Sequence, residues 1–204
     1  MGLLRKIFGP SRDEIWRQLS DEIGGEFVEG SFTRSSKVEV RIKEWLVTLD
    51  TYTVSTGKSS TTFTRMRAPY VNPDHFRFSI YRRNIFSNLG KALGMQDIVI
   101  GEPAFDDAFI IKGTDEGKVK QLFQIAKLRE MVQSQPRIHL TVKDDEGWFG
   151  SEFPEGVDEL YFRVAGVIKD VDRLKSLYLL FALTLNSLCH LGSAYEDDPQ
   201  VQLK

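Results

Sequence analysis

One stretch of the sequence, residues 105–132, contains both structural periodicities of the chain. The apolar run at residues 109–111 is typical of a short buried strand, and Gly113 interrupts it. Asp115 stands where a helix begins, and a carboxylate there favours the positive end of the helix dipole. Pro136 ends that helix. One long amphipathic helix is therefore expected, with an apolar stripe made of Val119, Leu122, Phe123, Ala126 and Val132.

Before this stretch the sequence favours antiparallel strands. Residues 37–43 alternate strictly, so Val38, Val40 and Ile42 should face a core. A strand over residues 45–54 follows and returns, through the turn signal at 56–59, as a strand over 61–68. Further strands are expected at residues 75–81, 97–100, 138–142 and 160–168. In the strand over 138–142, His139 should face outward, and the acidic, glycine-rich residues 144–159 should form an exposed connection.

Three more helices are expected. Ser11 and Glu14 have the spacing of a capping box, and Gly24 ends that first helix. Residues 85–93 favour a short helix. Asp170 or Asp172 caps a last helix that runs to about residue 191. No residue between 175 and 196 carries a fixed charge, which is long enough for a bilayer span, but its polar residues favour a buried helix instead.

Composition limits the class of protein. The 204 residues suffice for one domain with a sizeable core, and 41% hydrophobic with 27% charged residues is ordinary for a soluble globular chain. The net charge of −2 argues against a nucleic-acid partner. The single cysteine, Cys189, excludes an internal disulfide and a cysteine-based zinc site. The start of the chain lacks the long apolar core of a secretory signal, so the expected compartment is the cytoplasm.

The first ten residues are set apart by four apolar side chains beside Arg5 and Lys6. Such a basic, amphipathic start can contact a membrane surface. Because the segment is short, we interpret it as a flexible or docking segment instead. It is not a myristoylation signal, because Lys6 stands where serine or threonine is needed. The apolar residues of this segment are Leu3, Leu4, Ile7 and Phe8.

No motif in the sequence identifies an enzyme. Residues 56–59 end like a phosphate-binding loop, but Tyr52 occupies the position of the required glycine. The histidines lack metal-ligand spacing, so no metal or cofactor is predicted. Asp106 and Asp107 are expected on a strand, where adjacent carboxylates point to opposite faces. An enzyme site would need dispersed residues such as His75, His139 and Asp106 to converge on folding.

Charge is distributed unevenly along the middle of the chain. Residues 65–91 contain six basic residues and one acid, whereas residues 97–116 contain six acids and one base. If the basic residues share a sheet face, they could contact an anion or an acidic partner. The preferred interpretation is that they pair with the acidic segment that follows. The candidate partner or anion contacts are Arg65, Arg67, Arg77, Arg82 and Arg83.

Residues 101–112, GEPAFDDAFIIK, lead into a helix and carry a resemblance. The segment resembles a motif in uncharacterised bacterial proteins of unknown function, in which Phe-Asp-x-x-Phe and an apolar strand precede a helix. Phe105, Asp106 and Phe109 carry the match, which extends over residues 60–190. Because such proteins have no agreed function, the resemblance implies a bacterial, noncatalytic α+β domain and no catalytic residue.

Taken together, these patterns predict one α+β domain over residues 11–192, after a segment at 1–10 and before an acidic, frayed tail at 193–204. A mostly antiparallel curved sheet should be packed by an N-terminal helix and two longer helices, the last one C-terminal and buried. We expect a noncatalytic cytoplasmic binding or adaptor domain whose partner is a protein or a small molecule. The alternatives are a ligand-binding protein or enzyme with dispersed site residues, because a curved sheet can enclose a pocket, and a peripheral membrane protein.

Overall fold

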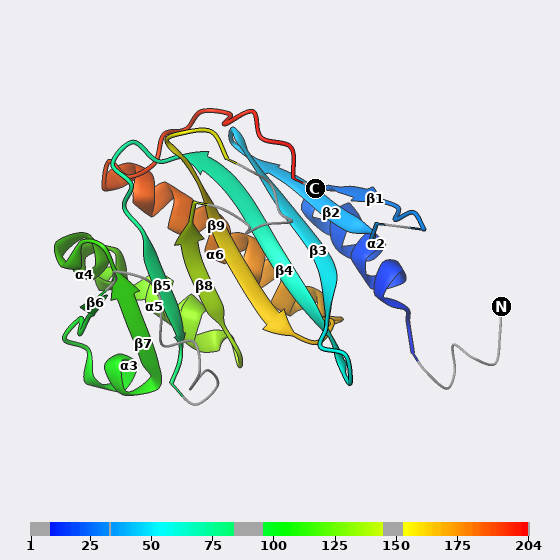
Figure 1. Cartoon of the computed structure of the whole chain (residues 1–204), viewed down its shortest axis with the longest axis horizontal. Helices are drawn as coiled ribbons and strands as arrows, with labels where there is room; N and C mark the ends of the chain where they lie inside the picture. The colour runs from blue at the N-terminus through cyan, green and yellow to red at the C-terminus, as the bar shows by residue number, and fades with distance from the viewer. Residues whose placement is uncertain (1–8, 33, 84–95, 145–152, 204) are drawn as a thin grey trace.

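The computed structural model describes residues 9–32, 34–83, 96–144 and 153–203, and it contains one curved sheet with helices against one face (Figure 1). The nine described strands follow the order β1-β2-β3-β4-β9-β8-β5-β7-β6, and every pair of neighbours is antiparallel. The α+β class and the curved antiparallel sheet are therefore confirmed. The segment at 85–93, expected as a helix, lies outside the described residues.

The strands are β1 (Glu26–Val28), β2 (Lys37–Ile42), β3 (Trp45–Ser55), β4 (Ser60–Val71), β5 (Phe78–Arg82), β6 (Gln96–Asp97), β7 (Phe109–Gly113), β8 (His139–Lys143) and β9 (Val157–Ala165). The helices are α2 (Arg12–Ile23), α3 (Pro103–Ala108), α4 (Glu116–Gln124), α5 (Ala126–Ser134) and α6 (Val171–His190). The strand β9 begins three residues earlier than the alternation indicates, so the connection before it is shorter than expected.

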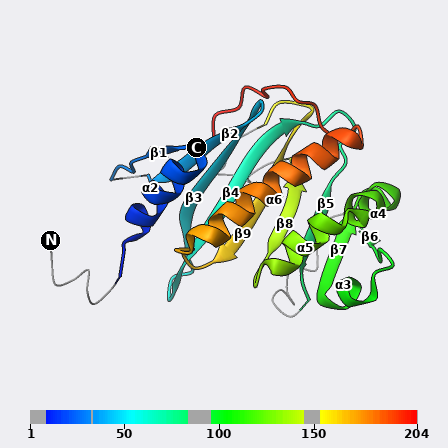
Figure 2. The ribbon, with the colours of Figure 1, turned by 180° about the vertical axis from the view of Figure 1, so that it is seen from behind.

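The core lies between the sheet and its helices. Seen from behind, α6 crosses the middle of the sheet, with α2 on one side and α4 and α5 on the other (Figure 2). Alternating strand residues such as Val38, Val40 and Leu49 are buried on this face, as period-two patterning requires. Nine residues of α6 are buried, which confirms that the last helix is a core helix. Among the described residues, no helix has the length and apolarity to cross a bilayer.

The helix starts follow the sequence signals. Ser11 accepts a hydrogen bond from the Glu14 backbone N–H while the Glu14 side chain accepts one from the Ser11 N–H, which completes the capping box. Gly24 ends α2 with φ 67°, in the left-handed region. Asp170, rather than Asp172, caps α6 by accepting from the Arg173 N–H.

The stretch at 105–132 is more broken than its periodicity indicates. The single long helix is in fact two helices, α4 and α5, because the backbone at Ile125 is extended, with φ −68° and ψ 103°. The aspartates at 106 and 107 lie on the short helix α3 and not on a strand. Pro103 begins this helix, as its fixed φ favours, and the strand starts only at Phe109.

The first residues of the tail, which was expected to be frayed, contact the rest of the chain. Ser193 and Ala194 are buried, and the Tyr195 N–H donates to the Val71 carbonyl at 3.0 Å. The indole Nε1–H of Trp45 donates to the Tyr195 carbonyl at 3.2 Å. Residues 193–195 therefore have defined contacts with the rest of the chain.

Candidate functional site

The sheet face that points away from the helices is polar, and much of it is nonetheless buried. Strand register places Thr48 opposite Arg67, and Arg67 opposite Tyr161, across β3, β4 and β9. The relative exposure of these three residues is 1%, 1% and 7%. Buried polar side chains need partners, so this face must hold an organised network of hydrogen bonds.

The centre of that network is Asp50. Register places Asp50 beside Arg65 on the neighbouring strand, and Arg67 follows two residues later on the same face. The Asp50 carboxylate accepts from Arg65 Nε at 2.5 Å and Nη2 at 3.0 Å, and from Arg67 Nη2 at 2.7 Å. One carboxylate therefore accepts hydrogen bonds from two guanidinium groups.

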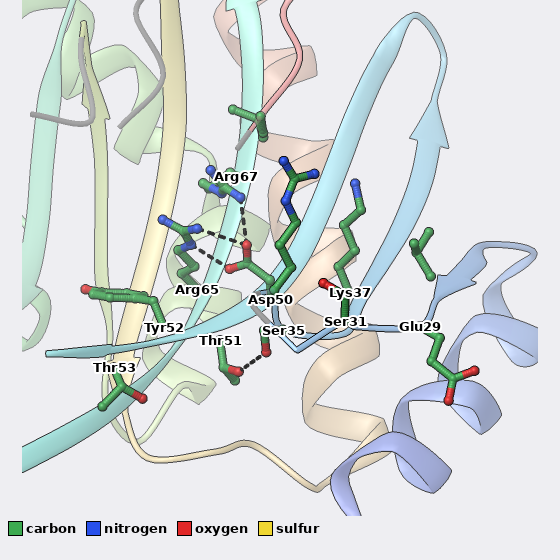
Figure 3. Close-up of a pocket in the computed structure, with 13 residues that line it drawn as sticks. Glu29, Ser31, Ser35, Lys37, Asp50, Thr51, Tyr52, Thr53, Arg65 and Arg67 are labelled. Carbon is green, nitrogen blue, oxygen red and sulfur yellow. Dashed lines mark hydrogen bonds and ion pairs between the residues drawn. The ribbon is translucent and has the colours of Figure 1, made fainter. Parts of the chain in front are cut away.

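These residues form the floor of a pocket of about 640 Å³ (Figure 3). This volume lies within the range of small-molecule sites. Hydroxyl groups from the β1–β2 connection and from β3 line it beside the arginines, and Ser35 and Thr51 are hydrogen-bonded to each other at 2.6 Å. The lining residues are Val28, Glu29, Ser31, Arg34, Ser35, Lys37, Asp50, Thr51, Tyr52, Thr53, Arg65, Arg67 and Leu203.

Cationic side chains outnumber carboxylates around the pocket, by four to two. Of the carboxylates, Glu29 also lies 3.3 Å from the guanidinium of Arg17. Lys37 pairs with Glu39 at 2.6 Å, just outside the pocket. Arg34 is exposed at the rim, and its guanidinium has no hydrogen bond or ion pair with any residue that the structure describes. The pocket therefore offers positive charge and hydroxyl donors to an anionic group.

His139 lies on the same sheet face but serves a different network. It points away from the helices as predicted, but it is buried, with 8% exposure. Its Nδ1 accepts from Arg163 Nε at 3.3 Å, and its Nε2 lies 3.2 Å from Ser79 Oγ. With Nδ1 as acceptor, Nε2 carries the proton and donates to the serine. This tautomer cannot take a proton from Ser79, so the pair is not arranged as nucleophile and base.

The burial of His139 also sets its charge state. Desolvation, with smaller contributions from the nearby cations Arg163 and Lys143, lowers the pKa of His139 to about 3. The imidazole is therefore neutral near neutral pH. A neutral histidine in this position adds no positive charge to the polar face.

The five arginines predicted as contacts do not share one surface. The structure brings Arg65 and Arg67 together on Asp50, whereas Arg77 contacts Asp158 at 3.1 Å and Asp144 at 2.8 Å. These three carboxylates lie outside the acidic segment that was expected to pair with the arginines.

The remaining two arginines complete helix ends. Arg82 donates to the carbonyls of Gln133 and Gln135 at the end of α5, and Arg83 to those of Asp106 and Asp107 in α3. Unpaired carbonyls at a helix C-terminus are favourable partners for arginine. Whether any of the five arginines contacts a partner or an anion stays a prediction.

The dispersed residues weighed for an enzyme have separate partners. Asp106 accepts from the backbone N–H groups of Ile100, Gly101 and Glu102, each at 3.0 Å. His75 is exposed in the β4–β5 connection, with a positive φ of 55°. The hydrogen bonds of His139 lead to Ser79 and Arg163. Within the described ranges, no three histidine, cysteine, aspartate or glutamate side chains are grouped to hold a metal ion.

The sequence reasoning missed most of the residues that line the pocket, among them Arg34, Lys37 and Asp50. Lys37 was read as a solvated strand charge, and Asp50 lies inside a strand rich in threonine and valine. An aspartate within such a strand was the available signal, because strand interiors disfavour aspartate. Arg34 reaches the pocket through a turn whose position depends on the whole β1–β2 connection.

A second hollow, of about 670 Å³, lies on the helical face between α5 and α6. Met131, Leu179 and Leu183 give it an apolar lining, and Leu179 is 63% exposed. It lies on the opposite face of the sheet from the arginine cluster, so the two hollows are separate features.

The fold and the pocket define a class: an α+β domain with one antiparallel sheet, helices on one face and a cationic pocket on the other. No family model matches the chain, and no curated protein matches its sequence. A solved structure that it resembles is the crystal structure of the mycobacterial trehalose monomycolate transport factor A, TtfA, with a TM-score of 0.51 over 87% of this chain and 94% of that chain. The identity is 8%, so the similarity shows a shared fold and nothing about the site.

Proposed function

We propose that this protein is a noncatalytic binding or adaptor domain that takes an anionic group, a phosphate or a carboxylate, in the pocket above Asp50. The observation that carries the proposal is the pair of guanidinium groups held by one carboxylate at the floor of that pocket. Such a pair is fixed in place before a ligand arrives, so little side-chain entropy is lost on binding.

The rim supports the same function. Arg34 is exposed beside the two fixed arginines and is free to close on a ligand. Planar guanidinium groups suit bidentate contact with carboxylates and phosphates. The similar fold belongs to a protein named as a transport factor, which agrees with a binding or accessory role without assigning one. A cytoplasmic and bacterial setting stays part of the proposal.

Calorimetric titration with inorganic phosphate, and separately with a small dicarboxylate, tests this function. The wild-type chain is expected to bind at least one of them, and Arg34→Gln is expected to weaken binding about tenfold, because a charged hydrogen bond is lost. Arg41→Gln is the matched control, since Arg41 is exposed and pairs with Asp198 away from the pocket. Equal affinity in both variants would contradict the assignment to this pocket.

A further inference from the structure

Phe32 lies in the chain between Ser31 and Arg34, which line the cationic pocket, and its side chain is in solvent. Its relative exposure is 107%, so no residue in the described part of the chain covers the ring. The flanking residues form a tight turn, in which the Ser31 N–H donates to the Arg34 carbonyl at 2.9 Å and the Arg34 N–H donates to the Ser31 carbonyl at 3.3 Å. Both flanking residues line the pocket. Phe32 therefore lies between two residues that are hydrogen-bonded to each other and that line the pocket.

The charges around Phe32 favour an anionic surface. Arg34 is two residues away and exposed, and Lys37, Arg65 and Arg67 lie in the same pocket. A neighbouring hollow, of about 660 Å³, shares Ser35 and Thr51 to Thr53 with the cationic pocket and adds Lys169. Val167, which also lines this neighbouring hollow, is 37% exposed. Cationic and exposed apolar side chains thus occur together along this part of the molecule.

A soluble anion explains the arginines but gives no role to the phenylalanine. A membrane surface explains both, because anionic lipids attract basic side chains while aromatic rings enter the interfacial layer. The carboxylates near the rim do not remove this attraction, since Glu29 is paired with Arg17 and Asp50 with two arginines. The arginines would bind the lipid headgroup. The Phe32 ring would distinguish a lipid from a free phosphate.

We propose that the pocket binds the phosphate of an anionic phospholipid at a membrane surface, and that Phe32 inserts beside it into the interface. This inference rests on the proposed function, because it names the source of the anionic group. Arg34 and Arg65 contact the phosphate, and Phe32, which follows Ser31 of the pocket lining, enters the acyl boundary. The expected attachment is peripheral and reversible, because one ring buries little apolar area.

Sedimentation with lipid vesicles tests the inference on the full chain. The probes are phosphatidylcholine vesicles with and without one third phosphatidic acid. The wild-type chain should sediment with the acidic vesicles only, and Phe32→Ser should weaken that binding at least about fivefold, since part of the ring's transfer free energy is lost. Val99→Ser is the matched control, because Val99 is 67% exposed on the connection between β6 and α3. Circular dichroism confirms that both variants are folded.

The possible outcomes distinguish the lipid inference from the proposed anion-binding function on which it rests. Phosphate binding by calorimetry, without vesicle binding, would overturn the lipid inference and leave the anion pocket intact. Failure of both would overturn both. Equal vesicle binding by wild type and Phe32→Ser would also overturn the inference. In that case a variant lacking residues 1–8 would show whether the basic, apolar N-terminal segment is the contact instead. Support requires that Phe32→Ser lowers vesicle binding while phosphate affinity stays unchanged.

Discussion

The Nη2 atom of Arg67 lies 2.7 Å from Oδ2 of Asp50, and both side chains are buried on the sheet face opposite the helices. Arg65 contacts the same carboxylate from the same strand as Arg67. An arginine that is 1% exposed is rare in a protein interior unless a charge partner holds it. The position of the cationic floor therefore depends on Asp50.

Asp50→Asn should be strongly destabilising. It leaves the buried guanidinium of Arg67 without its carboxylate, and removing one partner of a buried ion pair costs about 3–5 kcal/mol. Urea unfolding at pH 7 should show a lower transition midpoint. Asp107→Asn, at an exposed position of α3, is the control and should stay within about 0.5 kcal/mol of wild type. If Asp50→Asn changed the free energy of unfolding as little as the control does, water would have to solvate the cluster of Asp50, Arg65 and Arg67.

The free energy of unfolding should fall as the pH is lowered, and His139 should account for part of that fall. The pKa of His139 is about 3 in the folded chain, below its ordinary value of 6.5. Between these two values the unfolded chain binds a proton that the folded chain does not, so stability falls by up to about 1.4 kcal/mol per pH unit as pH drops below 6.5. Above pH 6.5 both states are neutral at this site, and no change is expected.

His139→Gln removes this dependence while keeping a side chain that can accept and donate hydrogen bonds. Unfolding midpoints measured from pH 7 to pH 4.5 should fall less steeply for the variant than for wild type. Parallel pH profiles would show that His139 is protonated in the folded protein and that its environment admits water.

The tail should contribute to stability. A chain that ends at Gly192 loses the acceptor of the Trp45 indole N–H and uncovers the site where Ser193 and Ala194 are buried. A buried donor left without a partner costs about 1–3 kcal/mol, so a loss of at least about 2 kcal/mol is expected in thermal or urea unfolding. Glu196→Gln, which removes only an exposed pair with Lys43, should have a small effect. If the truncated chain were as stable as wild type, the tail would not contribute to stability, as expected of a frayed segment.

Gly113 should not tolerate a side chain. A Cβ atom at this position would lie 2.5 Å from Cγ2 of Val119 and 3.3 Å from Cδ1 of Ile98. Overpacking of this kind costs about 1–3 kcal/mol, so Gly113→Ala should lower the unfolding midpoint. Val119→Ala in the same chain should recover part of the loss, because it removes the nearest contact. Additive losses in the double variant would show that the two positions do not compete for space.

Local signals predicted much of the fold. The capping box at Ser11, the alternation at residues 37–43 and the apolar last helix each correspond to an observed element. These features depend on residues that are close together in the sequence, so the sequence alone predicts them. The break at Ile125 could not, because the apolar stripe continues through it and the surrounding residues have good helical spacing.

The candidate site was less accessible to sequence reasoning. Arg65 and Arg67 were identified by their charge, but grouping them with Arg82 rested on nearness in sequence rather than in space. Asp50 meets Arg65 only through strand register, and Arg34 joins them through a turn between two other strands. Long-range pairing of this kind is a property of the assembled sheet.

Where an anion binds is the most direct test of the central claim. A titration of the ¹⁵N-labelled chain with inorganic phosphate, followed by NMR, gives the answer residue by residue. Binding in the pocket predicts saturable shifts concentrated at residues 31–37, 50–53 and 65–67, which line the pocket or stand next to its lining residues. No saturable shift, or shifts centred on Arg77, Arg82 and Arg83, would contradict it.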